Sequence, residues 1–226
     1  MGVILNLETS STNCSVCVAI DGVILSMKEL NSANYSHAEK LHIFMEEVLL
    51  QASLKMQDLD AIAVSKGPGS YTGLRIGVSA AKGLCYALDI PLISISTLKS
   101  MASQVKINLH DVVIPVLDAR RMEVYSAVFD AQLNEIRETK AEIVDENSFQ
   151  DYTNSGTVHF LGSGAEKIQE VIKNDTVTYH CSIVPSAKEM ALISWDKYQK
   201  KDFEDVAYFE PYYLKDFVLQ TKKIKS

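Results

Sequence analysis

The sequence predicts two α/β units with mixed sheets, one after the other along the chain. Three observations support this class. Each half opens with short apolar strands that follow one another directly, and each half continues with helices and single strands. The composition is that of a globular protein, with 226 residues of which 47% are hydrophobic. A strand meander followed by alternating helices and strands is typical of mixed sheets with flanking helices.

The first half contains five expected strands and two expected helices. Asp21 and Gly22 are a two-residue hairpin signal between the second and third strands. Ser36 and Glu39 have the spacing of a capping box at the start of the first helix. In chain order, the strands are expected at residues 3–8, 14–20, 23–30, 61–67 and 91–96, and the helices at residues 36–54 and 72–88.

The second half repeats this opening. Paired strands are expected at residues 111–118 and 123–130, with a third at 134–144 and another at 158–162. Two further capping boxes, Ser163 with Glu166 and Ser186 with Glu189, predict helices. We expect a boundary between residues 97 and 110, which gives a first domain at residues 1–105 and a second at residues 106–226. This division leaves open a return of the last residues to the first domain.

The charge of the chain argues against several function classes. A net charge of −7 and a pI of about 5.3 are unfavourable for a protein that binds nucleic acid by itself. The lysines of the tail, Lys222, Lys223 and Lys225, are interpreted as a solvated terminus. No segment approaches the roughly 20 apolar residues of a membrane span, and the start of the chain lacks the features of a signal peptide. We therefore expect a cytoplasmic protein without a membrane partner.

The four cysteines do not predict a metal site. Cys14 and Cys17 have a spacing that suits metal, but they lie in an expected strand, where their side chains point to opposite faces. Cys85 and Cys181 have no second cysteine or histidine at ligand spacing. We expect all four to be buried, reduced thiols.

The segment SKGPGSYTGLRIGVSAAKGL, residues 65–84, holds five of the ten glycines. A glycine-rich turn before a helix can bind phosphate through unpaired N–H groups, but glycine also permits two backbones to approach closely. The spacing is not that of a phosphate-binding GxxxxGK[ST] loop, and Lys82 lies nearly three turns into the helix. The glycine segment is therefore interpreted chiefly as a packing surface.

The helix at residues 72–88 has two apolar faces. One face, with Leu74, Val78, Ala81, Cys85 and Leu88, suits a sheet, and a polar stripe of Arg75, Ser79, Lys82 and Tyr86 runs elsewhere. The other face carries small residues that admit a second helix. The first helix has surplus apolar residues, which lie either under the second domain or at an interface with a partner. The expected partner surface comprises Ile43, Leu50, Gly73, Arg75, Ile76, Gly77, Ala80, Leu84 and Ala87.

Four segments together resemble the TsaB family, also called YeaZ, of bacterial tRNA threonylcarbamoyladenosine biosynthesis proteins. They are LNLETSS near the start, HAEKL in the first helix, the glycine segment, and VLDARRMEVY at residues 116–125. The resemblance is strong over residues 1–126, and beyond them only YFEPYYL at residues 208–214 is similar. It implies an actin-like ATPase fold of two ribonuclease-H-like domains.

The resemblance also implies a noncatalytic role. TsaB proteins bind the similar, catalytic TsaD subunit, and with a TsaE-type ATPase the set forms N6-threonylcarbamoyladenosine at position 37 of ANN-decoding tRNAs. It implies that tRNA is contacted only through the complex and that the chain alone binds no cofactor. It leaves open ATP or ADP at the partner interface and a homodimer when the chain is alone.

The residues that a metal-dependent relative would need are missing from the expected positions. The TsaD pattern has an HxxxH metal motif soon after the equivalent glycine helix and strand, where this chain reads PLISISTLKSMASQ. His37 and His42 diverge by about 140° on the first helix, and His37 is expected at the surface. Glu8 is the one acid near the first turn. We therefore expect no catalytic and no metal-binding residues.

Two other functions compete with the scaffold interpretation. An independent nucleotide-dependent enzyme of the actin-like or sugar-kinase type would need further acidic ligands for Mg²⁺, and a metallopeptidase would need a metal motif. Asp118, Arg120 and Arg121 could form a carboxylate and an anion clamp. We favour the interpretation that they stabilise a hairpin turn.

Overall fold

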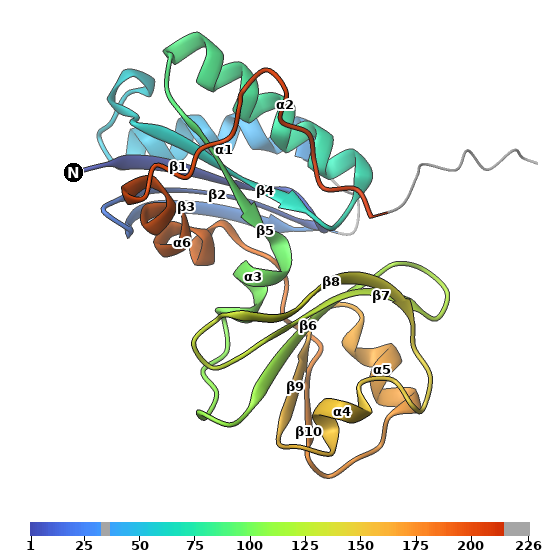
Figure 1. Cartoon of the computed structure of the whole chain (residues 1–226). Coiled ribbons are helices and arrows are strands. Elements are labelled where there is room, and N and C mark those ends of the chain that lie inside the picture. The colour runs from blue at the N-terminus through green and yellow to red at the C-terminus, as the bar shows by residue number, and fades with distance from the viewer. Residues whose placement is uncertain (33–36, 215–226) are drawn as a thin grey trace, which may run out of the picture.

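The computed structural model describes residues 1–32 and 37–214, and it contains two five-stranded sheets that form the upper and lower lobes of Figure 1. The first sheet has the order β3-β2-β1-β4-β5 and the second the order β10-β9-β6-β7-β8. The strands of the first sheet are β1 (Val3–Glu8), β2 (Asn13–Ile20), β3 (Val23–Asn31), β4 (Ala61–Gly67) and β5 (Leu92–Ser96). Those of the second are β6 (Val112–Asp118), β7 (Glu123–Phe129), β8 (Glu135–Ile143), β9 (Val158–Leu161) and β10 (Val177–His180).

Both sheets have the same topology. In each, the first three strands pair antiparallel, and the two later strands are added in parallel beside the first. The predicted duplication of a mixed α/β unit is therefore confirmed. The hairpin expected at Asp21 and Gly22 is also present, with φ values of 52° and 81°. Both values lie in the left-handed region that a tight hairpin requires.

The helices cover both sheets. They are α1 (His37–Gln51), α2 (Tyr71–Leu88), α3 (Thr97–Ala102), α4 (Gln150–Thr153), α5 (Ala165–Val171) and α6 (Ala187–Gln199), with a 3-10 turn, η1, at Met56–Asp58. The predictions did not include β10, α3 or α4. In the described ranges, none of these helices combines the length and the apolar character needed to cross a membrane.

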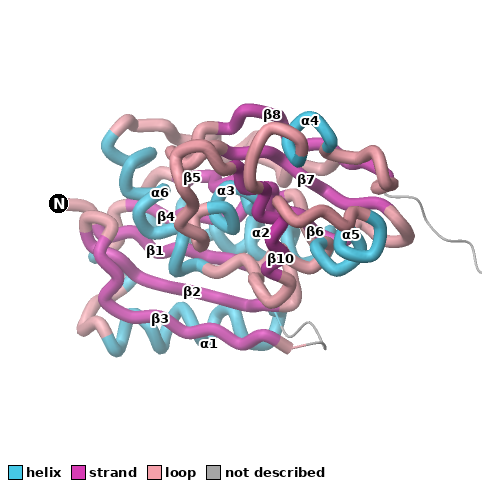
Figure 2. The backbone as a smooth tube through the Cα atoms, turned by 90° about the horizontal axis from the view of Figure 1, so that it is seen from below, coloured by secondary structure: helices cyan, strands magenta, loops and turns pink. Residues whose placement is uncertain are grey.

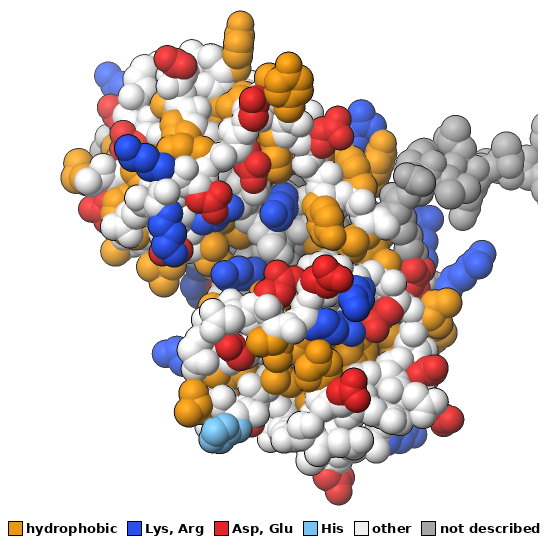
Figure 3. All heavy atoms as spheres, in the orientation of Figure 1, with side chains coloured by type: hydrophobic (Ala, Val, Ile, Leu, Met, Phe, Trp, Pro, Cys, Tyr) orange, Lys and Arg blue, Asp and Glu red, His pale blue; other side chains and the backbone are white. Residues whose placement is uncertain are grey.

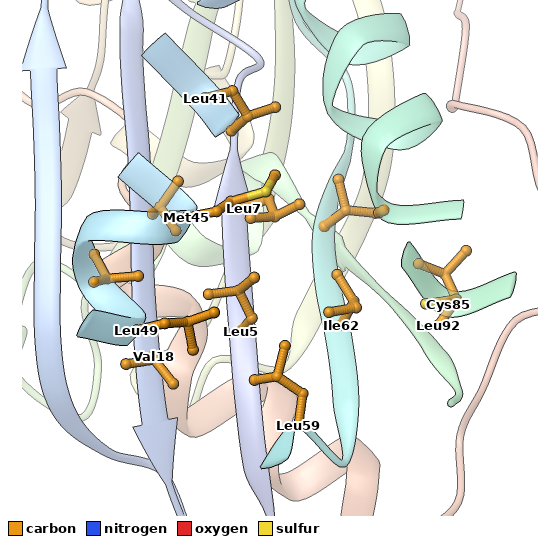
Figure 4. Packing of buried hydrophobic residues seen from close by; sticks show 14 of the residues in the cluster. Leu5, Leu7, Val18, Leu41, Met45, Leu49, Leu59, Ile62, Cys85 and Leu92 are labelled. Atoms are coloured by element: carbon orange, nitrogen blue, oxygen red, sulfur yellow. The ribbon is translucent and has the colours of Figure 1, made fainter. Parts of the chain in front are cut away.

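The core of the first lobe follows the alternation of β1. Leu5 and Leu7 point to the side of α1 and α2, where they pack with Leu41 and Met45 of α1 (Figure 4). Ile4 points to the opposite side and packs with α6. The first sheet is therefore enclosed between two helical layers. Burial of each such leucine contributes about 1.5–3 kcal/mol.

The chain returns to the first lobe after the second sheet. At the start of α6, the Ala187 N–H donates to Ser15 Oγ at 3.1 Å, and Cys17 Sγ donates to the Ala187 carbonyl oxygen at 3.1 Å. The later segment, residues 204–214, bonds to the edge of the sheet and passes α2 (Figure 1). Lys82 Nζ donates to the carbonyl oxygens of two residues of this segment, at 3.2 and 2.8 Å. Residues 187–214 therefore pack with the first sheet.

The second sheet is also covered on both faces. Ile114 and Phe160 pack with α5 on one face. On the other face, Val113 and Phe129 pack with Met101 of α3. The short helix α3 thus follows the last strand of the first sheet and covers the second sheet, which joins the two lobes through a shared apolar contact.

Of the three expected helix caps, the structure tests two. Ser36 lies outside the described residues. Ser163 does not cap α5, because its Oγ accepts a hydrogen bond from the Asp118 N–H at 3.1 Å, and α5 begins only at Ala165. By contrast, Ser186 does cap α6, where its Oγ accepts from the Lys188 N–H.

The cysteines are free thiols. Cys14 and Cys17 lie in core clusters on opposite faces of the first sheet, as predicted. Burial raises the pKa of Cys14 to about 11 and that of Cys17 to about 12, so both stay protonated at neutral pH. Cys181 is half-buried, which corrects the expectation of full burial for this residue.

Candidate functional site

The glycine segment packs against the turn between β1 and β2. A Cβ atom added to Gly73 would lie 2.1 Å from the Thr9 carbonyl oxygen, and one added to Gly77 would lie 2.3 Å from Thr9 Oγ1. Thr9 Oγ1 donates a hydrogen bond to the Gly73 carbonyl oxygen at 2.8 Å. Glycine at both positions therefore allows helix and turn to approach closely within one chain.

This contact corrects part of the predicted partner surface. Gly73 and Gly77 are buried beneath Thr9, so they do not lie on the open face of α2. The physical reason is that the small-residue face winds around the helix: its first two turns meet the β1–β2 turn, and its later turns are directed outward. Ala80 and Leu84 are half-buried, and Ala87 is exposed.

The remaining predicted residues form what we call the α1–α2 surface. Ile43 and Leu50 of α1 are 46% and 79% exposed. Arg75 is exposed, with its guanidinium over the Tyr71 ring and 2.7 Å from the Tyr71 hydroxyl. The surface comprises Ile43, Leu50, Arg75, Ile76, Ala80, Leu84 and Ala87. Exposed apolar side chains on neighbouring helices are typical of a protein interface.

His37 is buried, which corrects its expected surface position. Its ring is 1% exposed, and Nε2 lies 2.7 Å from the Ser11 carbonyl oxygen. Burial lowers the pKa of His37, so the neutral ring is favoured. His37 thereby fixes the start of α1 to the same turn that contacts α2.

Glu8 ends β1 beneath this turn and is fully buried. Its Oε1 accepts hydrogen bonds from the Ser10 N–H at 2.6 Å and from Ser65 Oγ at 3.0 Å, whereas Oε2 has no hydrogen-bond partner. Burial raises the pKa of Glu8, which the hydrogen bonds partly oppose. In the described ranges, no three His, Cys, Asp or Glu side chains are grouped so that they could hold a metal ion.

The turn between β6 and β7 carries the motif residues Asp118, Arg120 and Arg121. Asp118 Oδ1 accepts from the Arg120 N–H and from Lys167 Nζ, both at 2.6 Å, so this carboxylate stabilises the turn and anchors α5. Arg120 and Arg121 have φ values of 73° and 52°, which non-glycine residues rarely adopt. Neither guanidinium has an ion pair or hydrogen bond with any residue that the structure describes.

A cleft of about 1020 Å³ separates the two lobes at this turn. Its walls come from the β1–β2 turn, the start of α2, the β6–β7 turn and residues 212–214. In the orientation of Figure 1, acidic and basic side chains are interspersed over both lobes, with apolar side chains between them (Figure 3). This face therefore has no broad region of one charge.

The sequence is similar to known proteins along most of its length. A family model described as TsaD, tRNA N6-adenosine threonylcarbamoyltransferase, matches residues 31–223. The Escherichia coli tRNA threonylcarbamoyladenosine biosynthesis protein TsaB is 30% identical over 97% of this chain and 97% of its own. The TsaB protein of Haemophilus influenzae is 38% identical over 54% of this chain and 51% of its own.

The fold is also similar to solved structures. A Pseudomonas aeruginosa protein with similarity to peptidase YeaZ superposes with a TM-score of 0.84 at 23% identity, over 95% of this chain and all of the other. The two repeated mixed sheets are those of ribonuclease-H-like domains in the actin-like superfold, as predicted.

The close contact at Thr9 predicts that alanine has opposite effects on stability at two glycines of α2. Gly77→Ala should destabilise the protein by about 1–3 kcal/mol, because the new methyl group overpacks against Thr9. Gly83→Ala should stabilise it by about 0.5–1 kcal/mol, because a Cβ there meets nothing within 4 Å and alanine favours the helix. Urea unfolding of both variants measures the difference. Equal effects of the two substitutions would show that the close approach does not constrain the fold.

The burial of the Glu8 carboxyl group predicts that the stability of the protein depends on pH. Because burial raises the folded pKa of Glu8 above the ordinary value of 4.5 for glutamate, the unfolded state releases this proton first as the pH rises. The contribution of Glu8 to stability should be complete below pH 4.5 and should be lost as the pH rises through the folded pKa. Relative to Glu8→Gln, the wild type should therefore lose unfolding free energy as the pH rises above 4.5 in urea titrations. Parallel pH profiles of the two proteins would contradict the raised pKa.

Proposed function

The chain belongs to the TsaB family, also called YeaZ, and from this membership we propose that it is a noncatalytic subunit in tRNA modification. The modification is the formation of N6-threonylcarbamoyladenosine at position 37 of ANN-decoding tRNAs. The observation that carries the proposal is the 30% identity with the Escherichia coli TsaB protein along nearly the full length of both chains. The match to the TsaD family model supports a common origin with the transferase itself.

The state of the acidic residues supports the noncatalytic role. Glu8 is fully buried and accepts hydrogen bonds from the Ser10 N–H and Ser65 Oγ, and burial raises its pKa. The Asp118 carboxylate forms an ion pair with Lys167. An enzyme that binds Mg²⁺ with nucleotide needs ionised carboxylates open to the metal, so these two residues favour the scaffold over a kinase-type enzyme.

The α1–α2 surface is the proposed docking site for the TsaD-type subunit. It presents Ile43 and Leu50 beside the half-buried Ala80 and Leu84, so an apolar helix pair is available for helix packing. A specific interface of this kind buries at least about 1,200 Å² in total. A homodimer of the free chain would use the same surface and would compete with the heterodimer. A TsaE-type ATPase and tRNA would then join through the complex.

The test is rescue of the modified nucleoside in cells depleted of this protein. Depletion should lower threonylcarbamoyladenosine in tRNA hydrolysates measured by mass spectrometry, and the wild-type chain should restore it. Leu50→Asp should fail to restore it, because an unpaired charge buried in an apolar interface costs several kcal/mol. The matched control is Leu109→Asp, since Leu109 is 68% exposed but lies between α3 and β6, away from the α1–α2 surface.

The outcomes separate function from interface. Unchanged nucleoside levels after depletion would reject the role in tRNA modification. Full rescue by Leu50→Asp would be compatible with the role in tRNA modification, but it would show that the docking site lies elsewhere on the protein. Failure of both variants, with normal melting of each, would assign the defect to added surface charge and also reject the specific interface.

A further inference from the structure

A pocket of about 440 Å³ lies at the end of α6, on the opposite side of the first sheet from α1 and α2 (Figure 1). Its volume is within the range of small-molecule sites, about 300–1,000 Å³. We call it the α6 pocket, and it is lined by Pro91, Trp195, Tyr198, Gln199, Lys201 and Phe203. None of these residues lines the cleft between the lobes or belongs to the α1–α2 surface. The α6 pocket is therefore separate from both.

Three aromatic side chains form a row in this pocket. The ring centroids of Trp195 and Tyr198 are 5.7 Å apart with planes 19° from parallel, and those of Tyr198 and Phe203 are 5.8 Å apart. Aromatic rings attract one another at centroid distances of about 4.5–7 Å. Phe203 ends the row and is 37% exposed. A further planar ring can therefore extend the row at Phe203.

The aromatic row is held in place by the backbone at both ends. A Cβ atom added to Gly2 would lie 2.7 Å from Trp195 and 2.9 Å from Tyr198, so the backbone there packs directly against both rings. At the other end, the Glu204 N–H donates to a carbonyl oxygen of β5 at 2.9 Å, which fixes the residue after Phe203. A site that is ordered before binding loses less conformational freedom when a ligand binds.

Lys201 places an unpaired positive charge in the lining of the pocket. The two lysines nearest to it in sequence are each paired with an aspartate, at 3.2 and 2.7 Å, and the pairs are Lys197 with Asp202 and Lys200 with Asp196. Among the residues that the structure describes, the Lys201 ammonium group has no partner for an ion pair or a hydrogen bond. An anionic group in the pocket is therefore favoured at Lys201.

The backbone of Lys201 is unfavourable for lysine. Its φ of 54° lies in the left-handed region directly after α6, where the Asp202 N–H donates to the Lys197 carbonyl oxygen at 2.9 Å. Glycine is the usual residue at this position of a helix end, because a side chain there is strained. The lysine side chain makes no polar contact within the described residues that would offset this strain. A contact with a ligand accounts for a lysine at this position.

We propose that the α6 pocket binds a small aromatic carboxylate, with its planar ring against Phe203 and Tyr198 and its carboxylate at Lys201. Lysine binds a carboxylate through a compact positive charge with three donors. The exposed amide of Gln199 also lines the pocket and can donate a second hydrogen bond. Burial and the Asp60 carboxylate raise the pKa of Tyr198, so negative charge is disfavoured at that hydroxyl and is directed to Lys201. The ligand is bound and not converted.

The test is titration of the full chain with 2-naphthoate, followed by calorimetry and nuclear magnetic resonance. Trp195 is the single tryptophan of the chain, so its indole N–H gives one resonance that reports on the pocket, and this resonance should shift until the site is saturated. Two matched probes separate the contributions, because 2-naphthylmethanol lacks the charge and decahydro-2-naphthoate lacks the planar rings. Each should bind at least about threefold more weakly, the size expected for one exposed ion pair or one aromatic contact.

Substitutions of Lys201 distinguish a binding group from a structural one. Lys201→Gln and Lys201→Gly should each weaken 2-naphthoate binding at least about threefold and leave the binding of 2-naphthylmethanol unchanged. Lys201→Gly should also raise the melting temperature, because glycine relieves the left-handed backbone. The matched control Lys200→Gln removes a neighbouring cation outside the pocket lining and should leave affinity unchanged. Phe203→Ala should weaken the binding of all three probes.

The proposal is overturned if 2-naphthoate at millimolar concentration produces no saturable shift of the Trp195 resonance. It is also overturned if the acid and the alcohol bind equally, if Lys200→Gln weakens binding as much as the Lys201 variants, or if Phe203→Ala leaves binding unchanged. Because no partner subunit takes part in this experiment, each of these results leaves the proposed role in tRNA modification untouched.

Discussion

The first lobe depends on the close approach of α2 to the β1–β2 turn. Thr9 meets Gly73 and Gly77 at distances that exclude any side chain, and it is hydrogen-bonded to the Gly73 carbonyl oxygen. His37 fixes α1 to the same turn through the Ser11 carbonyl oxygen. One turn of the chain thus sets the positions of both helices on the sheet. The outer faces of α1 and α2 are thereby held side by side, as the proposed docking surface requires.

The same turn lies between the proposed docking surface and the cleft. Thr9 contacts α2 at Gly73 and Gly77, and the next residues, from Ser10 to Thr12, line the cleft between the lobes. Glu8 lies at the base of the turn and bonds to Ser10 and Ser65.

Most of the fold could be predicted from local pattern. The alternation of β1, the Asp21 and Gly22 hairpin and the sheet face of α2 each depend on neighbours in sequence, and each is present in the structure. The errors concern contacts between distant residues. The burial of Gly73 depends on Thr9, which is 64 residues away, and that of His37 depends on Ser11. Strand β10 has only four residues, too few for a periodic signal. For the site, the motifs LNLETSS and VLDARRMEVY identified residues of the β1–β2 and β6–β7 turns, but they gave no sign that the two turns face one cleft.

The central claim is that the glycines of α2 are used inside the chain, so that the outer faces of α1 and α2 are free for a partner. Hydroxyl-radical footprinting of the chain with and without a TsaD-type subunit tests it most directly. Oxidation of Ile43 and Leu50 should fall on complex formation, while that of Leu109, whose exposed fraction of 68% lies between theirs, should stay constant. Unchanged oxidation of Ile43 and Leu50 in a complex that has formed would contradict it.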